Sequence, residues 1–251
     1  MDIICDTNIW YNIGSGNIDT STVSSTDKLI GNYNNIDEFA GTINLLYSPD
    51  KTTKAIQAMY QFSQNHFLLD PPFTHIIKLH KPNFNIDLSE HTDFMIEFTT
   101  AIANGNTFLD EQKEDEFKTI CEERKQKLQN LTNVYNSEAE RIRQEIKGKK
   151  IKKKADRIPS IRNLISTFAS EQRGGEHLAP EYDWTKIELF ENAFLDFLIN
   201  LEKGAIKSTA NDWYDLFLLA YVQPDKKVWT KEKKWINIIN NAGMSKYLYD
   251  N

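Results

Sequence analysis

The chain is poor in cysteine and has no long apolar run. Its two cysteines among 251 residues, Cys5 and Cys121, lie in an apolar run and a charged, helix-like segment. We therefore expect no disulfide framework and a reducing compartment. No apolar stretch approaches the roughly 18 residues that a membrane-spanning helix needs. The N-terminus also lacks the features of a secretory signal, because Asp2 and Asp6 interrupt its only apolar segment. These absences predict a cytoplasmic protein with no membrane partner.

The composition is ordinary for a globular protein, with 40% hydrophobic and 26% charged residues. A chain of this length can bury one large core, or a core with an insertion. The net charge of −6 alone would weigh against nucleic acid as a partner. Between Arg141 and Arg157, however, there are nine Lys or Arg residues and only two acids, whereas residues 110–123 are mainly acidic. We therefore expect a basic patch on an acidic background.

Strands alternating with helices are predicted at both ends of the chain. The predicted strands are residues 2–5, 28–32, 227–229 and, as a last edge strand, 247–249. Helices are predicted at about 9–13, at 36–46 with Asn34 or Asn35 as cap, at 49–62 and from 231.

The middle of the chain is predicted to be mainly helical. Helical segments are expected at 88–103, in one or two exposed helices over 110–146, from 159, at 184–202 and at 209–221. Residues 68–84 contain three prolines and are predicted to be irregular, and Gly174-Gly175 to Pro180 is predicted to be a hinge. The pattern indicates an α/β core formed by residues 1–60 and 201–251, with a helical insertion at 61–200.

Several acids follow predicted strands or begin predicted helices. Asp6 comes directly after the first strand, beside Thr7 and Asn8, and open α/β sheets bind ligands at the carboxyl ends of their strands. Glu38 falls among apolar residues of a helix, so we expect it at the rim of a buried face, while Asp37 is expected to point to solvent. Each acid could instead be a turn or capping residue.

The other acids of interest lie near the C-terminus. Asp212 and Asp215 are three residues apart and share one face of a predicted helix, where like charges repel unless a cation compensates. Asp212 could be a cap, whereas Asp215 begins a strongly apolar segment. Glu232 follows a predicted strand, and with Thr230 it could form a simple helix start or reach the same sheet edge as Asp6.

No cation in the sequence is obviously placed to neutralise these carboxylates. Gathering them at one edge is unfavourable unless protons or a divalent metal compensate. Ligands that are all oxygen favour Mg²⁺ or Mn²⁺ over zinc. The sequence thus predicts a Mg²⁺ or Mn²⁺ site built from both ends of the chain.

The order of these residues resembles the PIN domain family. The matching segments are Asp6-Thr7-Asn8 after a strand, Glu38 on a helix, Asn211-Asp212-x-x-Asp215 before an apolar helix, and Val228-Trp229-Thr230-x-Glu232. The resemblance covers about residues 1–47 and 205–243, and residues 60–200 have no counterpart. It implies a PIN-like three-layer α/β/α fold with a central parallel sheet and a large helical insertion. It also implies a metal-dependent nuclease, and most members of the family cut RNA.

The resemblance further implies a role for each matching residue. Asp6, Glu38, Asp215 and Glu232 would be the catalytic acids and metal ligands, Asp212 an additional or alternative ligand, and Asn8 and Thr230 supporting residues. Glu232 stands where many members have Asp, and its longer side chain could weaken metal binding. The implied reaction is metal-assisted hydrolysis of a phosphodiester bond.

A lysine-rich segment is the expected contact with nucleic acid. Phosphate contacts of this kind depend on salt and do not read sequence. The alternative is a solvated basic face or a segment that docks a partner. The residues concerned are Lys149, Lys150, Lys152, Lys153 and Lys154.

The histidines and one aromatic run have simpler interpretations. We expect the histidines to be structural or surface residues, since they lack metal-site spacing: His66, His75, His80, His91 and His177. Core-like spacing predicts packing rather than base stacking for Trp213, Tyr214, Phe217, Tyr221 and Trp229, although the first two would lie close to the acids.

The leading hypothesis is a cytoplasmic, metal-dependent endoribonuclease that acts as a toxin or defence effector. Its insertion would select the RNA or bind a protein partner or inhibitor. Two alternatives stay open, namely a non-catalytic PIN-like module that binds nucleic acid or protein, and a flap-endonuclease-like enzyme acting on DNA. The presence of all four acids argues against the module. The sequence leaves the number of metals and the oligomeric state open.

Overall fold

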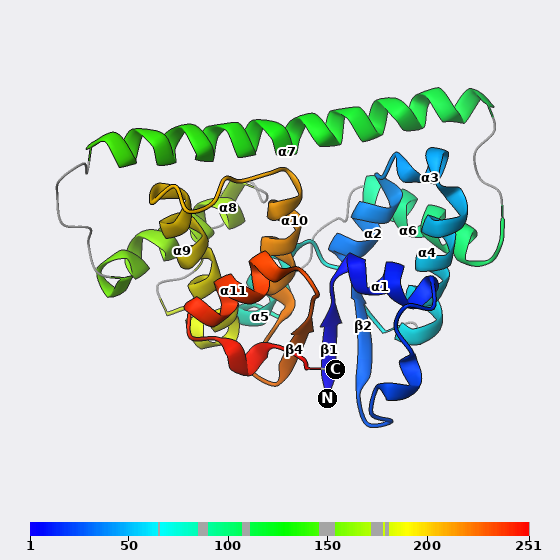
Figure 1. The fold of residues 1–251 in the computed structure, drawn as a ribbon, viewed down its shortest axis with the longest axis horizontal. Coiled ribbons are helices and arrows are strands. Elements are labelled where there is room, and N and C mark those ends of the chain that lie inside the picture. The colour runs from blue at the N-terminus through cyan, green and yellow to red at the C-terminus, as the bar shows by residue number, and fades with distance from the viewer. Residues whose placement is uncertain are drawn as a thin grey trace.

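A parallel β-sheet lies at the centre of the molecule. The computed structural model describes residues 1–64, 66–84, 90–106, 111–145, 154–171, 178 and 181–250. In these residues the strands are β1 (Asp2–Cys5), β2 (Lys28–Asn32), β3 (Phe67–Leu68) and β4 (Lys226–Trp229). All pairings are parallel, in the order β3-β2-β1-β4 (Figure 1). The chain therefore has an α/β fold with a large helical region.

Eleven α-helices surround this sheet in the described residues. They are α1 (Thr7–Gly14), α2 (Tyr33–Ala40), α3 (Asn44–Tyr47), α4 (Pro49–Ser63), α5 (Pro72–His80), α6 (Glu90–Ala103), α7 (Glu111–Glu145), α8 (Ile158–Glu171), α9 (Glu188–Glu202), α10 (Asn211–Leu218) and α11 (Lys233–Asn241). Short 3₁₀ helices occur at 20–22, 154–157, 184–187, 219–221 and 245–247. In the described segments no helix is both long and apolar enough to cross a membrane.

Both faces of the sheet are covered. Side chains alternate along a strand, so in β1 Ile4 enters one core while Ile3 and Cys5 enter the other. The first, here called the α9 core, also contains buried residues of α5, α8, α9, α10 and α11. The second, the α4 core, contains those of α1, α2, α4 and α6. This two-sided burial explains why the inner residues of β1, β2 and β4 are mainly apolar, while charged residues begin these strands.

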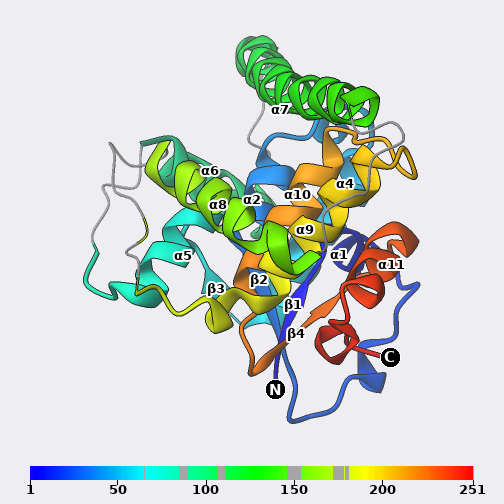
Figure 2. The same ribbon diagram turned by 90° about the vertical axis from the view of Figure 1, so that its left-hand side faces the viewer.

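Helix α7 connects the two cores. Phe117 and Cys121 belong to the α4 core, whereas Ala139 belongs to the α9 core. The helix extends along one side of the whole molecule, and β1 runs from the N-terminus towards that side (Figure 1). Figure 2 looks nearly along α7 and shows it outside α2, α4 and α10. The carboxyl ends of the strands therefore face the side on which α7 lies.

The strands predicted at 2–5, 28–32 and 227–229 are confirmed, with β4 one residue longer. The last predicted strand is wrong, because residues 245–247 form a 3₁₀ helix and, within the described residues, a single isolated bridge between Val228 and Leu248 takes the place of a strand. The predicted irregular segment 68–84 is also wrong. It contains the end of β3 and all of α5, since Pro72 lies in the first turn, where a helix needs no amide donor.

The predicted helix cap at Asn34 or Asn35 is wrong by two or three residues. Asn32, the last residue of β2, is the N-cap, and its side chain accepts from the Asn35 amide. The Asn35 side chain accepts in turn from the Asn32 amide, which completes a capping box. The helix predicted over 36–46 is divided, because α2 ends at Ala40 and α3 is separate.

Some predictions lie partly or wholly outside the described residues. Of the hinge at residues 174–180, only Leu178 is described. The division into an interrupted core and an insertion stays a prediction. Both cysteines are free and buried, as expected.

Close packing of α1 against α4 gives a first test of the fold. A Cβ on Gly14 would lie 2.5 Å from the Lys54 carbonyl oxygen, so we expect Gly14→Ala to lower the free energy of unfolding by about 1–3 kcal/mol. Gly16 has a φ of +74° and no atom near its would-be Cβ. Gly16→Asn, which tolerates that backbone conformation, should stay close to wild type. Urea denaturation measures both, and equal losses would contradict the packing described.

Candidate functional site

The register of the sheet brings Asp6 and Thr230 together. Cys5 pairs with Trp229, so the residue after each strand emerges at the same edge. The Asp6 amide donates to the Trp229 carbonyl at 3.0 Å, and the Thr230 hydroxyl donates to Asp6 Oδ2 at 2.8 Å. Asp6 also caps α1, because its Oδ1 accepts from the Asn8 amide at 3.3 Å. Asp6 is thus fixed at the carboxyl ends of β1 and β4, and its side chain is buried.

Glu232 lies at the outer side of Asp6. Asn8 Nδ2 donates to Glu232 Oε1 at 2.8 Å, and the Glu232 amide donates to the Thr230 hydroxyl oxygen at 3.1 Å. Glu232 is exposed and precedes α11 without capping it through its side chain. Asn8 and Thr230 therefore each hold one of the two acids, which is the geometry expected of supporting residues.

Glu38 reaches the site from α2. The Thr7 hydroxyl lies close to the Glu38 carboxylate, and that hydroxyl accepts from Asn35 Nδ2 at 3.1 Å. Burial raises the pKa of Glu38 to about 7, the nearby Thr7 hydroxyl opposes the rise, and the negative charge of Asp6 adds to it. Glu38 is half-buried, as expected for a residue at the rim of a core.

Asp215 reaches the site from α10. It is half-buried, and its Oδ2 accepts from Trp235 Nε1 at 2.8 Å. Burial raises the pKa of Asp215 well above its usual value, and the charges of Asp6 and Glu38 raise it further. The pKa of Asp6 is raised to about 6, mainly by burial against the opposing Thr230 hydrogen bond. Three carboxylates from three elements therefore lie close enough to repel one another.

Asp212 is held differently from these three acids. Its Oδ1 lies 2.6 Å from Lys234 Nζ, and its Oδ2 accepts from the amide and hydroxyl of Thr209 at 2.6 and 2.8 Å. The expectation that no cation is placed to neutralise the acids is therefore wrong for Asp212. These contacts are those of a cap and an ion pair, so metal ligation by Asp212 would require it to leave Lys234.

Arg124 is a residue of the site region that sequence reasoning missed. From α7 it pairs with Asp37 at 2.6 Å and lies over the Tyr214 ring, 4.6 Å from its centroid. The expectation that Asp37 points to solvent is thus wrong. Arg124 also donates to the Glu38 carbonyl at 3.4 Å, and a Cβ on Gly41 would collide with its guanidinium. Arg124 lies in a long run of charged residues, so no spacing distinguishes it from its neighbours.

The donors at the sheet edge are all oxygens, which suits Mg²⁺ or Mn²⁺. Asp6, Glu38 and Asp215 have no ion-pair partner among the described residues. In that same part of the chain, however, no group of three or more Asp, Glu, His or Cys side chains is arranged to hold a metal as it stands. The Thr230 hydroxyl donates to one oxygen of Asp6, and the Trp235 indole donates to one oxygen of Asp215. The two carboxylates would therefore have to turn to bind a cation.

The described lysine and arginine residues of the predicted basic patch form ion pairs with acidic residues. Lys154 lies 2.6 Å from Asp196, a buried residue of α9, and Arg157 pairs with Glu202 of the same helix. Arg141 pairs with Glu138 and Glu145 on its own helix, and Arg143 with Glu140. Four of the lysines assigned to nucleic acid lie outside the described residues: Lys149, Lys150, Lys152 and Lys153.

The histidines and aromatic residues largely follow expectation. His75 is buried against Tyr221, its pKa is lowered to about 4 mainly by burial, and His80 packs on Tyr182. The side chain of His91 and all of His177 lie outside the described residues. Packing is confirmed for Trp213, Tyr221 and Trp229, which are buried in the cores, and for Phe217, which packs against the α9 core; Tyr214 belongs to neither core.

Asn35 holds the strand ends at this site, which gives a second test. Its Oδ1 accepts from Trp10 Nε1 and from the amide and side chain of Asn32, and its Nδ2 donates to the Cys5 carbonyl and to Thr7. Asn35→Ala leaves these buried groups without partners, so we expect a loss of about 2–4 kcal/mol in unfolding free energy. Asn133→Ala, at an exposed asparagine of α7, should change it by less than about 0.5 kcal/mol. Chemical denaturation compares the two, and a small effect at Asn35 would contradict its structural role.

The raised pKa of Asp6 predicts how stability depends on pH without metal. The folded-state value of about 6 exceeds the usual 3.8, so between these pH values the folded protein binds more protons than the unfolded chain. Stability should therefore fall as pH rises from about 4 to above 6. Asp6→Asn keeps a capping side chain and should raise stability at pH 8 by about 1–3 kcal/mol.

Denaturation in EDTA at pH 4.5 and pH 8 measures this difference. Asp19→Asn is the matched control, because hydrogen bonds from Ser21 lower the pKa of Asp19, and its loss should reduce stability at pH 8. If Asp6→Asn instead lowered the free energy of unfolding equally at both pH values, the pKa of Asp6 would not be raised in the folded state.

Comparison with protein-family models, with curated proteins and with solved structures found no match to this chain. The site is therefore interpreted from its own geometry and chemistry. That geometry places Asp6, Glu38 and Asp215 together, holds Glu232 beside them through Asn8, and sets Asp212 apart with Lys234.

Proposed function

We propose that the chain is a metal-dependent endonuclease that hydrolyses phosphodiester bonds, with RNA as its expected substrate. One observation carries the proposal. Asp6, Glu38 and Asp215 come from different elements, lie at the carboxyl edge of a parallel sheet, and have pKa values raised by burial and by nearby negative charge. Groups whose pKa values are perturbed in this way are candidates for a functional site, and the carboxyl edge of a parallel sheet is where α/β proteins bind ligands.

A divalent cation would relieve the repulsion among these carboxylates. Asp6, Glu38 and Asp215 would hold it, and Glu232, kept near by Asn8, would complete the acidic set from the solvent side. A bound Mg²⁺ or Mn²⁺ supplies a Lewis acid and lowers the pKa of water. The chain's own groups position two of the acids, since Thr230 donates to one oxygen of Asp6 and Trp235 donates to one oxygen of Asp215.

The resemblance to PIN domains supports the same proposal at the level of the fold. A central parallel sheet with helices on both faces is compatible with the PIN-like three-layer arrangement that the sequence predicts. We extend the proposal to a cytoplasmic toxin or defence effector, in which the helical region between the matching segments selects RNA or a protein partner or inhibitor. Two free, buried cysteines suit a reducing compartment.

A non-catalytic PIN-like binding module is the second candidate. It is favoured by the absence, among the described residues, of acids that already surround a metal position. A flap-endonuclease-like enzyme would use the same carboxylates on DNA, so the two nucleases differ in substrate rather than in site.

The nuclease proposal is tested with matched, end-labelled RNA and DNA oligonucleotides in Mn²⁺ or Mg²⁺. We expect cleavage by the wild type and a loss of at least about 100-fold in Asp6→Asn and Asp215→Asn, because each removes a charged ligand. The exposed Asp50, at the start of α4, provides the control Asp50→Asn, which should cleave normally. Asp212→Asn should stay within a few-fold of wild type if Asp212 is only a cap.

Thermal unfolding with Mn²⁺ provides a readout besides activity. The metal should raise the Tm of the wild type and not that of Asp6→Asn. Cleavage of DNA alone would favour the flap-endonuclease-like alternative. Nucleic-acid binding with neither cleavage nor Mn²⁺ stabilisation would favour the binding module and defeat the nuclease.

A further inference from the structure

A groove of about 500 Å³ lies between α7, the segment from the end of α2 through α3, and the start of α10. Lys118 and Lys125 of α7 line one side, and Asn44 and Tyr47 of α3 line another, with contributions from α10. Glu38 is also among the lining residues. The groove therefore reaches the acidic site, and α7 forms one of its walls.

The groove is lined by an exposed aromatic ring and by a cation that forms no ion pair in the described residues. Tyr47 is 74% exposed, the most exposed of the large hydrophobic side chains in the described residues. Lys125 is exposed and forms no ion pair within the part of the chain that the structure describes, whereas Lys118 pairs with Glu114. A ring that can stack on a base and a free cation that can contact phosphate are the elements of single-strand binding.

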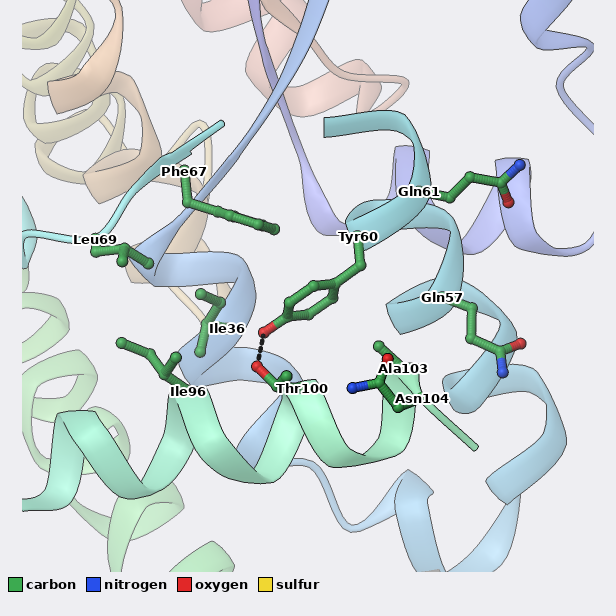
Figure 3. Close-up of a pocket in the computed structure, with 10 residues that line it drawn as sticks. All are labelled: Ile36, Gln57, Tyr60, Gln61, Phe67, Leu69, Ile96, Thr100, Ala103 and Asn104. Atoms are coloured by element: carbon green, nitrogen blue, oxygen red, sulfur yellow. Dashed lines mark hydrogen bonds between the residues drawn. The ribbon is translucent and has the colours of Figure 1, made fainter. Parts of the chain in front are cut away.

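Two other cavities do not reach Glu38, although one of them also has an exposed aromatic ring, Phe94, and an exposed lysine, Lys127. One of about 690 Å³, between α4, α6 and β3, is lined by apolar, amide and hydroxyl groups without a charged side chain, and its Tyr60 hydroxyl bonds Thr100 (Figure 3). The other, on the opposite flank of α7, contains Asp37, Glu123 and Lys127 but does not include Glu38. Neither offers phosphate contacts next to the acids.

We propose that the groove beside α7 binds a single strand of nucleic acid, with a base stacked on Tyr47 and a phosphate at Lys125. This inference rests on the proposed nuclease function and adds its substrate class. A duplex fits less well, because its bases are already stacked on their neighbours and offer no free face to Tyr47. A strand seated in this way would reach Glu38, the one acid of the proposed site that lines the groove.

Binding is measured by fluorescence anisotropy with labelled eight-nucleotide RNA and DNA strands and their duplexes, in EDTA so that no cleavage interferes. Tyr47→Leu should weaken single-strand binding about tenfold, and Tyr47→Phe should keep it within about twofold, since phenylalanine also stacks. Lys125→Gln should weaken it about three- to tenfold and lower the salt dependence by about one phosphate contact.

Lys127→Gln is the matched control for Lys125→Gln. Both lysines are exposed on α7, but Lys127 lines only the opposite flank. All the altered side chains are exposed, so the variants should fold, and their Tm values are compared with wild type. Three results would each refute the proposed binding groove. They are an equal loss of single-strand affinity in Lys127→Gln, an unchanged affinity in Tyr47→Leu, and tighter binding of duplex than of single strands.

Failure of the groove and failure of the nuclease can be told apart. In one outcome, metal-dependent cleavage is lost in Asp6→Asn but unaffected in Tyr47→Leu and Lys125→Gln. That result would support the nuclease proposal and refute the proposed role of the groove. In the other outcome, single-strand binding depends on Tyr47 and Lys125 but no cleavage occurs in Mn²⁺. That result would support the binding role of the groove and refute the nuclease proposal.

Discussion

The side chain of Asn35 is the interaction on which the arrangement of the site depends. It bonds the Cys5 carbonyl at the end of β1, Asn32 at the end of β2 and the Thr7 hydroxyl at the start of α1. A buried amide can satisfy several backbone and side-chain groups at once, and each becomes costly if left unpaired. The two central strand ends are thereby held at a fixed separation. Asp6 follows one of them and Glu38 lies on the helix that begins at the other, so their proximity is a consequence of this network.

Among the described residues no cation forms an ion pair with these acids, although the charge of Arg124 opposes the rise that burial causes in the pKa of Glu38. Near the site, Arg124 is held by Asp37 and Lys234 by Asp212. Further away, Lys154, Arg157 and Arg162 pair with the buried acids of α9. A cation placed directly on Asp6 or Asp215 would neutralise the negative charge by which, on our proposal, these acids would bind a metal. The observed pairing holds the fold together through other acids and leaves Asp6, Glu38 and Asp215 without an ion-pair partner in the described residues.

The sequence predicted most of what is local and less of what is tertiary. The strands around Ile4, Ile30 and Val228 follow from short apolar runs, and the acids after them follow from the rule that parallel strands end at one edge. The Asn32 cap was missed because a strand residue and a cap can be the same residue. The pairing of Asp37 with Arg124 joins positions 87 residues apart, and no periodicity within one sequence specifies such a contact. The same reason explains why Lys234 was not anticipated as the partner of Asp212.

Helix α7 makes the two cores and the site interdependent. Its first half packs in the α4 core through Phe117, and its second half packs in the α9 core through Ala139. Between these anchors Arg124 contacts α2 beside Glu38, and Asn136 exchanges two hydrogen bonds with Ser208 shortly before α10. A helix of 35 residues fixed at both ends resists local displacement, because moving its middle would unpack a core. The wall of the groove is therefore anchored in both cores. If the groove binds a single strand as proposed, a wall fixed in advance lowers the cost of ordering that strand.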